Sequence, residues 1–380
     1  MKKLLFQIHL WIGLLLFLPL VLLGVSGSAL VVFESIEQAK PSIHAPDTGP
    51  AHSYDEIATA ALKSAPKGAR VAAFTAFTAP EKAGDAAEVR IGRGPRGGVL
   101  VDVDPATLQI LATDKAGGRG PIFSLAHDLH GRLLIDGAAG RQVVGWLGVA
   151  MTLLGLTGIY IWWPRKGAWA RAFTVSASKN SYRFNRDLHG ATGIWILTVF
   201  MVVSLTGVLI AFPDPLTKAI TSIAPGRDQR ATQNAIKITP IEGVRPIGLD
   251  EIARLARAAA PDARLISIAP AQRDQPARVL MAQRGYQDRT PALNLIIDPY
   301  QDRVIEVRDP RTYTLGENIQ AWQRALHEGS GFGIVWKVLV FISGLVPLIF
   351  SITGIAMWLI KRKARVEMFE PEPKELAAAD

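Results

Sequence analysis

The sequence contains no cysteine among its 380 residues. This absence excludes disulfides, cysteine-ligated iron–sulfur clusters and covalent haem attachment through a Cys-x-x-Cys-His motif in this chain. If the chain carries a redox group, histidine must hold it, and only seven histidines are present. These few residues are therefore the first candidates for cofactor binding.

Charged side chains are missing from three long apolar runs, at 143–163, 191–212 and 338–360. About 20 residues of helix cross the hydrocarbon core of a bilayer, so each run predicts a transmembrane helix. A fourth run, at 4–33, follows Lys2 and Lys3 and is about twice as long as the apolar stretch of a secretory signal. We expect it to be a retained helix as well.

Basic residues of the short segments gather on one side of the four predicted helices. They are Lys2, Lys3, Arg165, Lys166, Arg171, Lys179, Arg183, Arg186, Lys361, Arg362, Lys363 and Arg365. The positive-inside rule makes that side the cytoplasm, with both termini there and residues 34–142 and 213–337 outside. The net charge of +9 follows from this topology and is no sign of nucleic-acid binding.

The two external segments share two short phrases. "YDEIATAALKSAP" at 54–66 matches "LDEIARLARAAAP" at 249–261, and "VDVDPATLQIL" at 101–111 matches "LIIDPYQDRVI" at 295–305. The two offsets agree within one residue, which indicates a duplication. Each copy reads as an amphipathic helix followed by alternating strands with an Asp-Pro turn, which predicts a small α+β domain.

The helices repeat in the same way. His9 and His189 each precede a Ser-Gly or Thr-Gly pair by 17 residues, and His130 and His327 lie 27 and 26 residues before the threonines of two similar "TGI" phrases. Both copies start and end inside, so we expect a parallel repeat related by a pseudo-twofold axis along the membrane normal.

The predicted fold is therefore a membrane α-helical protein with four transmembrane helices in a parallel internal repeat and two small external α+β domains. The expected segments are transmembrane helix 1 at 1–33, external domain 1 at 34–120, an amphipathic segment at 121–142, transmembrane helix 2 at 143–163, a basic cytoplasmic loop at 164–186, transmembrane helix 3 at 187–212, external domain 2 at 213–315, a second amphipathic segment at 316–337, transmembrane helix 4 at 338–360 and a cytoplasmic tail at 361–380.

The duplication supplies two symmetric histidine pairs, one for each membrane face: His9 with His189, and His130 with His327. Two imidazoles facing each other are what a low-spin electron-transfer haem requires, and polar residues at membrane depth are usually functional. Gly13 and Gly193, four residues after the first two histidines, would leave a flat recess for a porphyrin. The alternatives are interfacial anchors and a zinc or copper site.

Arginines near the histidines are candidate partners for haem propionates, because a guanidinium can bind a carboxylate through two hydrogen bonds. They are Arg183, Arg186, Arg132, Arg141 and Arg324. For the outer pair His127 competes with His130. We favour His130 as the ligand, because its distance to the downstream Thr-Gly pair matches that of His327. His127 then becomes a candidate for a propionate or substrate contact, or an ordinary surface residue.

The chain resembles the PepSY-associated transmembrane helix family of iron-regulated inner-membrane proteins, which includes ferri-siderophore reductases. The resemblance rests on "QIHLWIGLLLFLPLVLLGVSG", the "DEIA" and "DP" phrases, "DLHG" at 128–131 and 187–190, and "TGIYIWWPRK". It implies two b-type haems, PepSY-like external domains and electron delivery to ferric siderophores outside. Some relatives carry a fused flavodoxin and NADPH-binding module. No dinucleotide fingerprint is present here, so we expect a separate electron donor.

The expected function is a diheme reductase in which electrons pass from the haem of His9 and His189 to that of His130 and His327, and then to a ferric chelate. The alternative is a non-redox membrane protein whose external domains bind a partner, as a regulator or uptake accessory. A divalent-metal transporter is disfavoured because the predicted helices carry no acidic residues.

Overall fold

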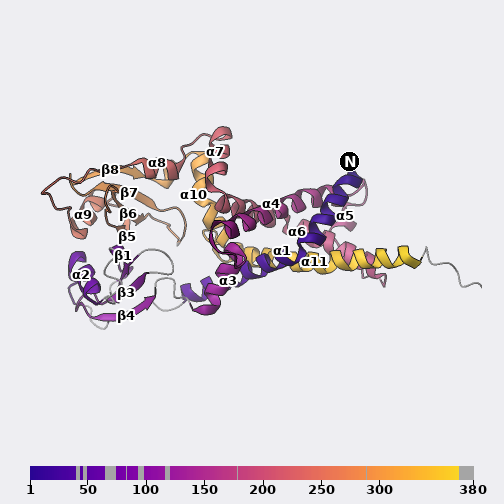
Figure 1. Cartoon of the computed structure of the whole chain (residues 1–380), viewed down its shortest axis with the longest axis horizontal. Coiled ribbons are helices and arrows are strands. Elements are labelled where there is room, and N and C mark those ends of the chain that lie inside the picture. Colours follow the sequence, from indigo (N-terminus) through magenta and orange to yellow (C-terminus); the bar gives the residue numbers. More distant parts are fainter. Residues whose placement is uncertain are drawn as a thin grey trace, which may run out of the picture. The chain divides into compact units, whose positions relative to one another are not determined.

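The chain folds into two compact units in the computed structural model (Figure 1). The helical unit comprises Met1–Val32, Ala126–Ala211 and His327–Asp380, and the sheet unit comprises Phe33–Leu125 and Phe212–Leu326. The structure describes residues 1–39, 43–45, 49–64, 74–82, 84–92, 98–115, 120–177, 179–287 and 289–367.

Four long helices build the helical unit. They are α1 (Lys2–Ala39), α4 (Gly137–Trp162), α6 (Ser181–Ala211) and α11 (Gly333–Glu367). Within the described residues these four are long and apolar enough to cross a membrane, which confirms the prediction of four candidate spans. Each is longer than the charge-free run that predicted it, because polar turns extend the helix beyond the apolar stretch.

Three shorter helices flank the long ones. They are α3 (Pro121–Arg132), which precedes α4, α5 (Trp169–Ala172), which lies between α4 and α6, and α10 (Leu315–Glu328), which precedes α11. The sequence predicted amphipathic segments at the positions of α3 and α10. Each of these two helices carries one histidine of the outer pair near its C-terminal end.

Small residues let the long helices approach closely, as is usual where lipid surrounds a bundle. A Cβ atom added to Gly24 of α1 would lie 2.3 Å from the Gly344 carbonyl oxygen of α11. The Ser28 hydroxyl donates to the Phe341 carbonyl across the same contact at 2.8 Å. In the second helix pair, a Cβ at Gly148 of α4 would meet the Val208 side chain of α6 at 2.9 Å. The first helix pair thus packs backbone against backbone at a glycine, and in the second a glycine makes room for a valine side chain.

The helical unit has an apolar core of its own. Its buried members are Leu20, Leu23, Val31, Leu147, Met151, Ile196, Val199, Phe200, Val340 and Val346. On α6 the core residues Ile196, Val199 and Phe200 all lie between His189 and Thr206. The core therefore separates the two ends of the bundle at which the histidines are found.

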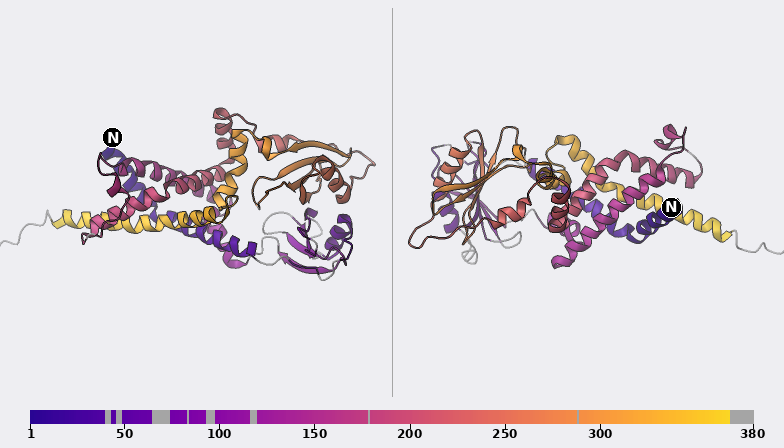
Figure 2. Two further views of the ribbon diagram at one scale, coloured as in Figure 1. Left: turned by 180° about the vertical axis from the view of Figure 1, so that it is seen from behind. Right: turned by 90° about the horizontal axis from the view of Figure 1, so that it is seen from above.

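The sheet unit is built on one eight-stranded antiparallel sheet in the order β4-β3-β2-β1-β5-β6-β7-β8 (Figures 1 and 2). Its elements are α2 (Tyr54–Ser64), β1 (Phe74–Thr78), β2 (Ala87–Ile91), β3 (Val99–Val103), β4 (Ile110–Lys115), α9 (Leu249–Ala259), β5 (Arg264–Ala269), β6 (Ala277–Ala282), β7 (Leu293–Asp298) and β8 (Arg303–Arg308). Each half therefore has one helix followed by four strands. The sequence predicted a helix followed by strands in each half, without their number.

The two halves are joined by pairing of β1 with β5, through Phe77 opposite Ile268 and Thr78 opposite Ser267. Both residues of the first pair are fully buried, and a single hydrophobic cluster runs across the junction beneath α2 and α9. The sequence predicted two separate small domains. The structure instead places both halves in one continuous sheet with one core.

The helix starts of the two halves cap each other. The Asp250 carboxylate accepts hydrogen bonds from the backbone N–H groups of Tyr54 and Asp55, at 3.0 and 3.1 Å. The Asp55 carboxylate accepts from those of Leu249 and Asp250, at 2.9 and 3.3 Å. Each helix N-terminus thus receives a carboxylate from the other half, where the N–H donors and the helix dipole favour negative charge.

The second half carries additional helical segments on the chain between α6 and α9 and after β8. They are α7 (Pro213–Ile223), α8 (Gln229–Ala235) and the 3₁₀ turn η2 (Pro310–Thr312). Asp228 caps α8 by accepting from the Ala231 N–H at 2.8 Å. The tail predicted at 361–380 continues α11 as far as Glu367, and its remaining residues lie outside the described part of the chain.

Candidate functional site: two facing histidine pairs

The first pair of facing imidazoles comes from the N-terminal parts of α1 and α6. The ring centroids of His9 and His189 lie 6.2 Å apart, and their planes are inclined by 69°. Both rings are partly buried. The His189 ring also packs on Phe350 of α11, at 4.7 Å between centroids.

The second pair comes from the last turns of α3 and α10. The ring centroids of His130 and His327 lie 5.9 Å apart, with planes inclined by 42°. These are the two pairings that the repeat predicted. Both rings are again partly buried.

Hydroxyl side chains fix the orientation of the first pair. His9 Nδ1 lies 2.9 Å from the Thr157 hydroxyl, and His189 Nδ1 lies 2.8 Å from the Thr353 hydroxyl. Each hydroxyl already donates its only hydrogen to the carbonyl four residues earlier, at 2.7 Å in both helices. The hydroxyls must therefore accept, so Nδ1 of each histidine carries the proton.

Backbone carbonyls fix the orientation of the second pair of imidazoles. His130 Nδ1 lies 2.9 Å from the Leu23 carbonyl oxygen, and His327 Nδ1 lies 2.9 Å from that of Val203. A carbonyl can only accept, so both Nδ1 atoms are donors. The Thr206 hydroxyl also lies 3.3 Å from His327 Nδ1. Ser26 is the matching hydroxyl on α1, and it donates to the Leu22 carbonyl at 2.6 Å.

All four imidazoles therefore share one tautomer, with the proton on Nδ1 and the lone pair on Nε2. A histidine binds a metal through such a lone pair, and a ligating histidine usually donates its other ring N–H to an acceptor. Within the described part of the chain, Nε2 of His9, His130 and His189 makes no hydrogen bond. The three atoms thus remain available as ligands.

Glycines let the imidazole rings pack closely against the neighbouring helices. An added Cβ at Gly27 would lie 2.8 Å from His130 Cε1, and one at Gly207 would lie 2.9 Å from His327 Cε1. In the first pair the distances are longer, 3.4 Å from Gly158 to His9 and 3.9 Å from Gly354 to His189. Each glycine directly follows one of the four hydroxyl residues, so a Ser-Gly or Thr-Gly pair on each long helix receives one imidazole.

These Ser-Gly and Thr-Gly pairs lie against the imidazoles, and the sequence reasoning did not assign them to the site. Ser26, Thr157, Thr206 and Thr353 served there only to align the two halves. Their spacing from the histidines was visible, but which helix face meets which ring depends on helix rotation in the bundle. Gly13 and Gly193, predicted to flank the imidazoles, do not contact them. A Cβ at Gly13 would meet nothing within 4 Å, and one at Gly193 would meet Phe350 at 3.6 Å.

The two pairs lie at different levels of the bundle. The first contains His9 and His189, and the second lies against Gly27 and Gly207 of the same two helices. From each histidine to the hydroxyl residue before the glycine is 17 residues, which corresponds to about 25 Å of helix at about 1.5 Å per residue. This separation is close to the thickness of the hydrocarbon core, about 30 Å.

The spacing within each pair suits one metal ion between the rings. A metal–nitrogen bond is about 2 Å long, so two imidazoles on opposite sides of one ion have centroids about 6 Å apart. The observed separations are 6.2 and 5.9 Å. The rings of each pair are therefore spaced as two ligands of one ion would be.

Burial favours the neutral ligand form at His130, which lies outside the spanning helices. Burial, together with the neighbouring His327 imidazole, lowers the pKa of His130 to about 4. The ring is consequently neutral at physiological pH, and it need not lose a proton before it can bind a metal.

His127 lies one turn before His130, and its side chain is exposed. It is not part of the facing pair, so the structure brings His327 together with His130. His130, which the sequence favoured over His127 as a ligand, is therefore the histidine that faces His327.

The predicted arginine partners mostly contact acidic side chains close by. Arg132 pairs with Asp128 at 3.2 Å, and Arg186 pairs with Asp187 at 2.7 Å, with Arg183 3.9 Å from the same carboxylate. The Arg141 guanidinium donates to the Ile210 carbonyl. Arg324 lies exposed on α10. Their role toward propionates stays a prediction.

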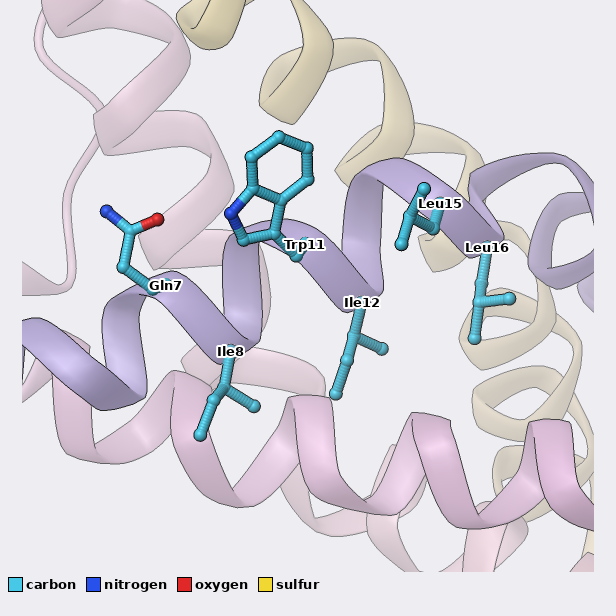
Figure 3. Close-up of a pocket in the computed structure, with 6 residues that line it drawn as sticks. All are labelled: Gln7, Ile8, Trp11, Ile12, Leu15 and Leu16. Carbon is cyan, nitrogen blue, oxygen red and sulfur yellow. The ribbon is translucent and has the colours of Figure 1, made fainter.

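A shallow hollow of about 440 Å³ also lies along α1 beside the first pair (Figure 3). It is lined by Gln7, Ile8, Trp11, Ile12, Leu15 and Leu16. Figure 3 shows Gln7 and Trp11 on one side of the helix and Ile8 and Ile12 on the other. No histidine lines it, so we do not assign it to the candidate site.

Four helices that are long and apolar enough to cross a membrane define an integral membrane protein. The chain belongs to the family described as the PepSY-associated TM region, whose model matches residues 6–361. The match begins within α1 and ends within α11, and it includes all four paired histidines. No curated protein matches the chain significantly.

Proposed function

We propose that the protein is a diheme b-type reductase of the bacterial inner membrane. It would pass electrons from the cytoplasmic side to a ferric siderophore on the external side and release Fe(II) during iron uptake. Two haem b groups would each have two histidine ligands, His9 with His189 and His130 with His327. A haem held in this way supplies one-electron transfer and has no open coordination position.

The main observation behind the proposal is that all four imidazoles have the same tautomer, with the proton on Nδ1. In each, Nδ1–H has an acceptor, and the lone pair is therefore on Nε2. A structural histidine needs no such match between two rings. Polar groups at membrane depth are costly unless they serve a function, and His9 and His189 both lie on spanning helices.

The number of ligands favours haem over a bare metal ion. Protein zinc sites have three or four ligand side chains, whereas each level here has two. Among the described residues no group of three or more His, Cys, Asp or Glu side chains could hold a metal ion. A porphyrin provides the other four nitrogen ligands itself, so two histidines are sufficient.

The placement of the two levels supports transfer across the membrane. They are separated by about 25 Å of helix, and the basic residues cluster on the side of the first pair. By the positive-inside rule the first pair is near the cytoplasm and both termini are cytoplasmic. The electron donor would act on that side, and the sheet unit would be external.

The substrate class follows from the chemistry of iron. Oxygen chelators bind the more highly charged Fe(III) much more strongly than Fe(II), so one electron loosens the iron and leaves the chelator intact. Release needs no nucleophile and no acid catalyst from the protein. This is consistent with a site that offers imidazole ligands and no hydrolytic side-chain set.

We further propose that the chain is an internal duplication in parallel orientation, with two PepSY-like lobes in the sheet unit. Support comes from the repeated order of one helix and four strands. The hydrogen-bond partners of the imidazoles match across the halves as well: Thr157 corresponds to Thr353, and Leu23 corresponds to Val203.

The proposal is tested by mixing the dithionite-reduced protein, freed of excess dithionite, with a ferric siderophore and following the haem absorption bands. We expect re-oxidation of the bands and one Fe(II) per electron, trapped by a coloured Fe(II) chelator. Reduced haem that persists with every ferric chelate would exclude the reductase function. A colourless protein from haem-replete cells would favour the alternative, a non-redox PepSY membrane protein that acts as a regulator or uptake accessory.

A further inference from the structure

A cluster of arginine and amide side chains lies on one face of the sheet, opposite the face covered by α9. It comprises Arg278 of β6, Asn294 of β7, Arg308 of β8 and Gln229 of α8. The strand register places Asn294 directly opposite Arg308 and Leu280, so that Arg278 is its diagonal neighbour. Helix α8 lies beside β8 (Figure 1) and is held there by hydrogen bonds from Arg308 to the Gln229 carbonyl and the Thr232 hydroxyl, at 2.8 and 3.2 Å.

Each of these four residues has a buried polar atom without a hydrogen-bond partner in the described part of the chain. The atoms are Arg278 Nε, Arg308 Nε, Gln229 Nε2 and Asn294 Oδ1. Three are N–H donors, and the Asn294 amide can present its NH₂ group instead if it is turned over. A buried polar group left unpaired costs about 1–3 kcal/mol, so several in one place indicate a missing acceptor.

The charged side chains in and next to the cluster do not balance. The Glu306 carboxylate accepts from both Arg308, at 2.9 Å, and Arg227, at 3.3 Å, and Glu317 accepts from Arg227 at 3.0 Å. With Arg278 there are three guanidinium groups for two carboxylates. Burial and the nearby Arg308 charge lower the pKa of Arg278, and no carboxylate raises it. Within the described part of the chain, one positive charge is thus left without a negative partner.

We propose that this cluster, formed by Arg278, Arg308, Asn294 and Gln229, binds a small oxyanion with at least two oxygen atoms, such as a carboxylate or a phosphate. Guanidinium N–H groups donate to such oxygens through charge-assisted hydrogen bonds, which are about twice as strong as neutral ones. One monoanion supplies the missing charge, and its oxygens accept from the unpaired donors. The site does not depend on the histidine pairs, so it stands whether or not the protein is a reductase.

The test is calorimetric titration of the purified full-length protein in detergent, at fixed ionic strength, with phosphate in one arm and acetate or citrate in the other. We expect one site per chain in at least one arm, and that arm identifies the class of anion. Arg278→Gln should weaken binding about tenfold or more, because it removes a charged donor. Arg278→Lys, which keeps the charge but loses Nε, should weaken it less.

The matched control is Arg245→Gln, which removes an exposed arginine of the same unit outside the cluster and should bind as the wild type does. Thermal unfolding of each variant shows that it is folded. Equal binding by wild type and Arg278→Gln would overturn the proposal. So would the absence of binding in every arm, which would mean that water alone satisfies the buried donors.

Discussion

The imidazole of His130 rests directly on Gly27. A Cβ atom at this glycine would lie 2.8 Å from His130 Cε1, closer than such atoms normally approach. The contact fixes where the ring can lie while its Nδ1–H donates to the Leu23 carbonyl on the same helix. The glycine and the carbonyl together aim the ring at His327.

We therefore expect Gly27→Ala to displace His130 and to lower the occupancy of the outer haem, while the inner haem stays bound. Alanine is favoured over glycine within a helix by about 1 kcal/mol, so lost helix stability cannot be the cause. The haem-to-protein ratio and the reduced-minus-oxidised spectrum measure the effect. The control is Gly131→Ala, one residue from His130, where an added Cβ meets nothing within 4 Å. If both variants lose haem equally, the contact with Gly27 is not what positions the ring.

The two histidines of α3 should behave differently. His130→Ala removes a ring that faces His327 at 5.9 Å and should abolish the outer haem. His127→Ala changes an exposed side chain and should leave two haems per chain. Haem quantification of both variants decides the matter. Loss of haem in His127→Ala alone would exchange the two roles.

The threonine hydroxyls should tune the inner site. Thr157→Val removes the acceptor 2.9 Å from His9 Nδ1 while keeping the shape of the side chain. A second-shell partner makes its histidine a better donor to the metal, and its loss typically costs 10–100-fold in affinity. We expect weaker haem retention and a higher reduction potential for the inner haem, because a less basic ligand stabilises Fe(III) less.

Spectroelectrochemical titration measures that shift. Thr157→Ser keeps the hydroxyl and should restore both properties, which a purely structural effect of the substitution would not predict. Thr353→Val should act in the same direction, because Thr353 accepts from His189 at 2.8 Å. An unchanged potential in both valine variants would show that the hydroxyls have no influence on the ligands.

The paired carboxylates of the sheet unit should have opposite dependences on pH. Burial raises the pKa of Asp55, and hydrogen bonding to the Asp250 carboxyl adds to the effect. For Asp250 burial acts in the same direction but is outweighed by the N–H groups of Tyr54 and Asp55, which lower its pKa. The stabilising contribution of Asp55 is thus full at low pH and lost as pH rises through its folded pKa. That of Asp250 is present above its ordinary pKa and lost as pH falls.

At neutral pH we expect Asp250→Asn to destabilise the protein by about 1 kcal/mol, the usual value of a helix cap. Asp55→Asn should be less harmful, because it removes the repulsion between the two carboxylates. The difference between the variants should shrink as pH falls toward about 4, near the ordinary pKa of aspartate. Thermal unfolding across this range checks the prediction. Equal destabilisation by both variants at neutral pH would contradict the assigned pKa directions.

The sequence could predict the four spanning helices and the two histidine pairings for simple physical reasons. Charge-free runs have few alternatives to a membrane span, and matching offsets in a duplication identify equivalent residues. It could not predict that β1 pairs with β5, because joining two edge strands depends on contacts distant in sequence. The reciprocal caps of Asp55 and Asp250 follow from that junction. The positions of the imidazoles against Gly27 and Gly207 depend on the rotation of the helices about their axes, which the spacing of residues in the sequence does not determine.

The central claim is that each histidine pair holds one haem, and the most direct test is an absorption spectrum of the purified full-length protein from haem-replete cells. We expect a Soret band that sharpens and shifts on reduction with dithionite, and two haems per chain. His9→Ala and His327→Ala should each reduce this number to one. A colourless protein, or a haem content unaffected by both substitutions, would contradict the account.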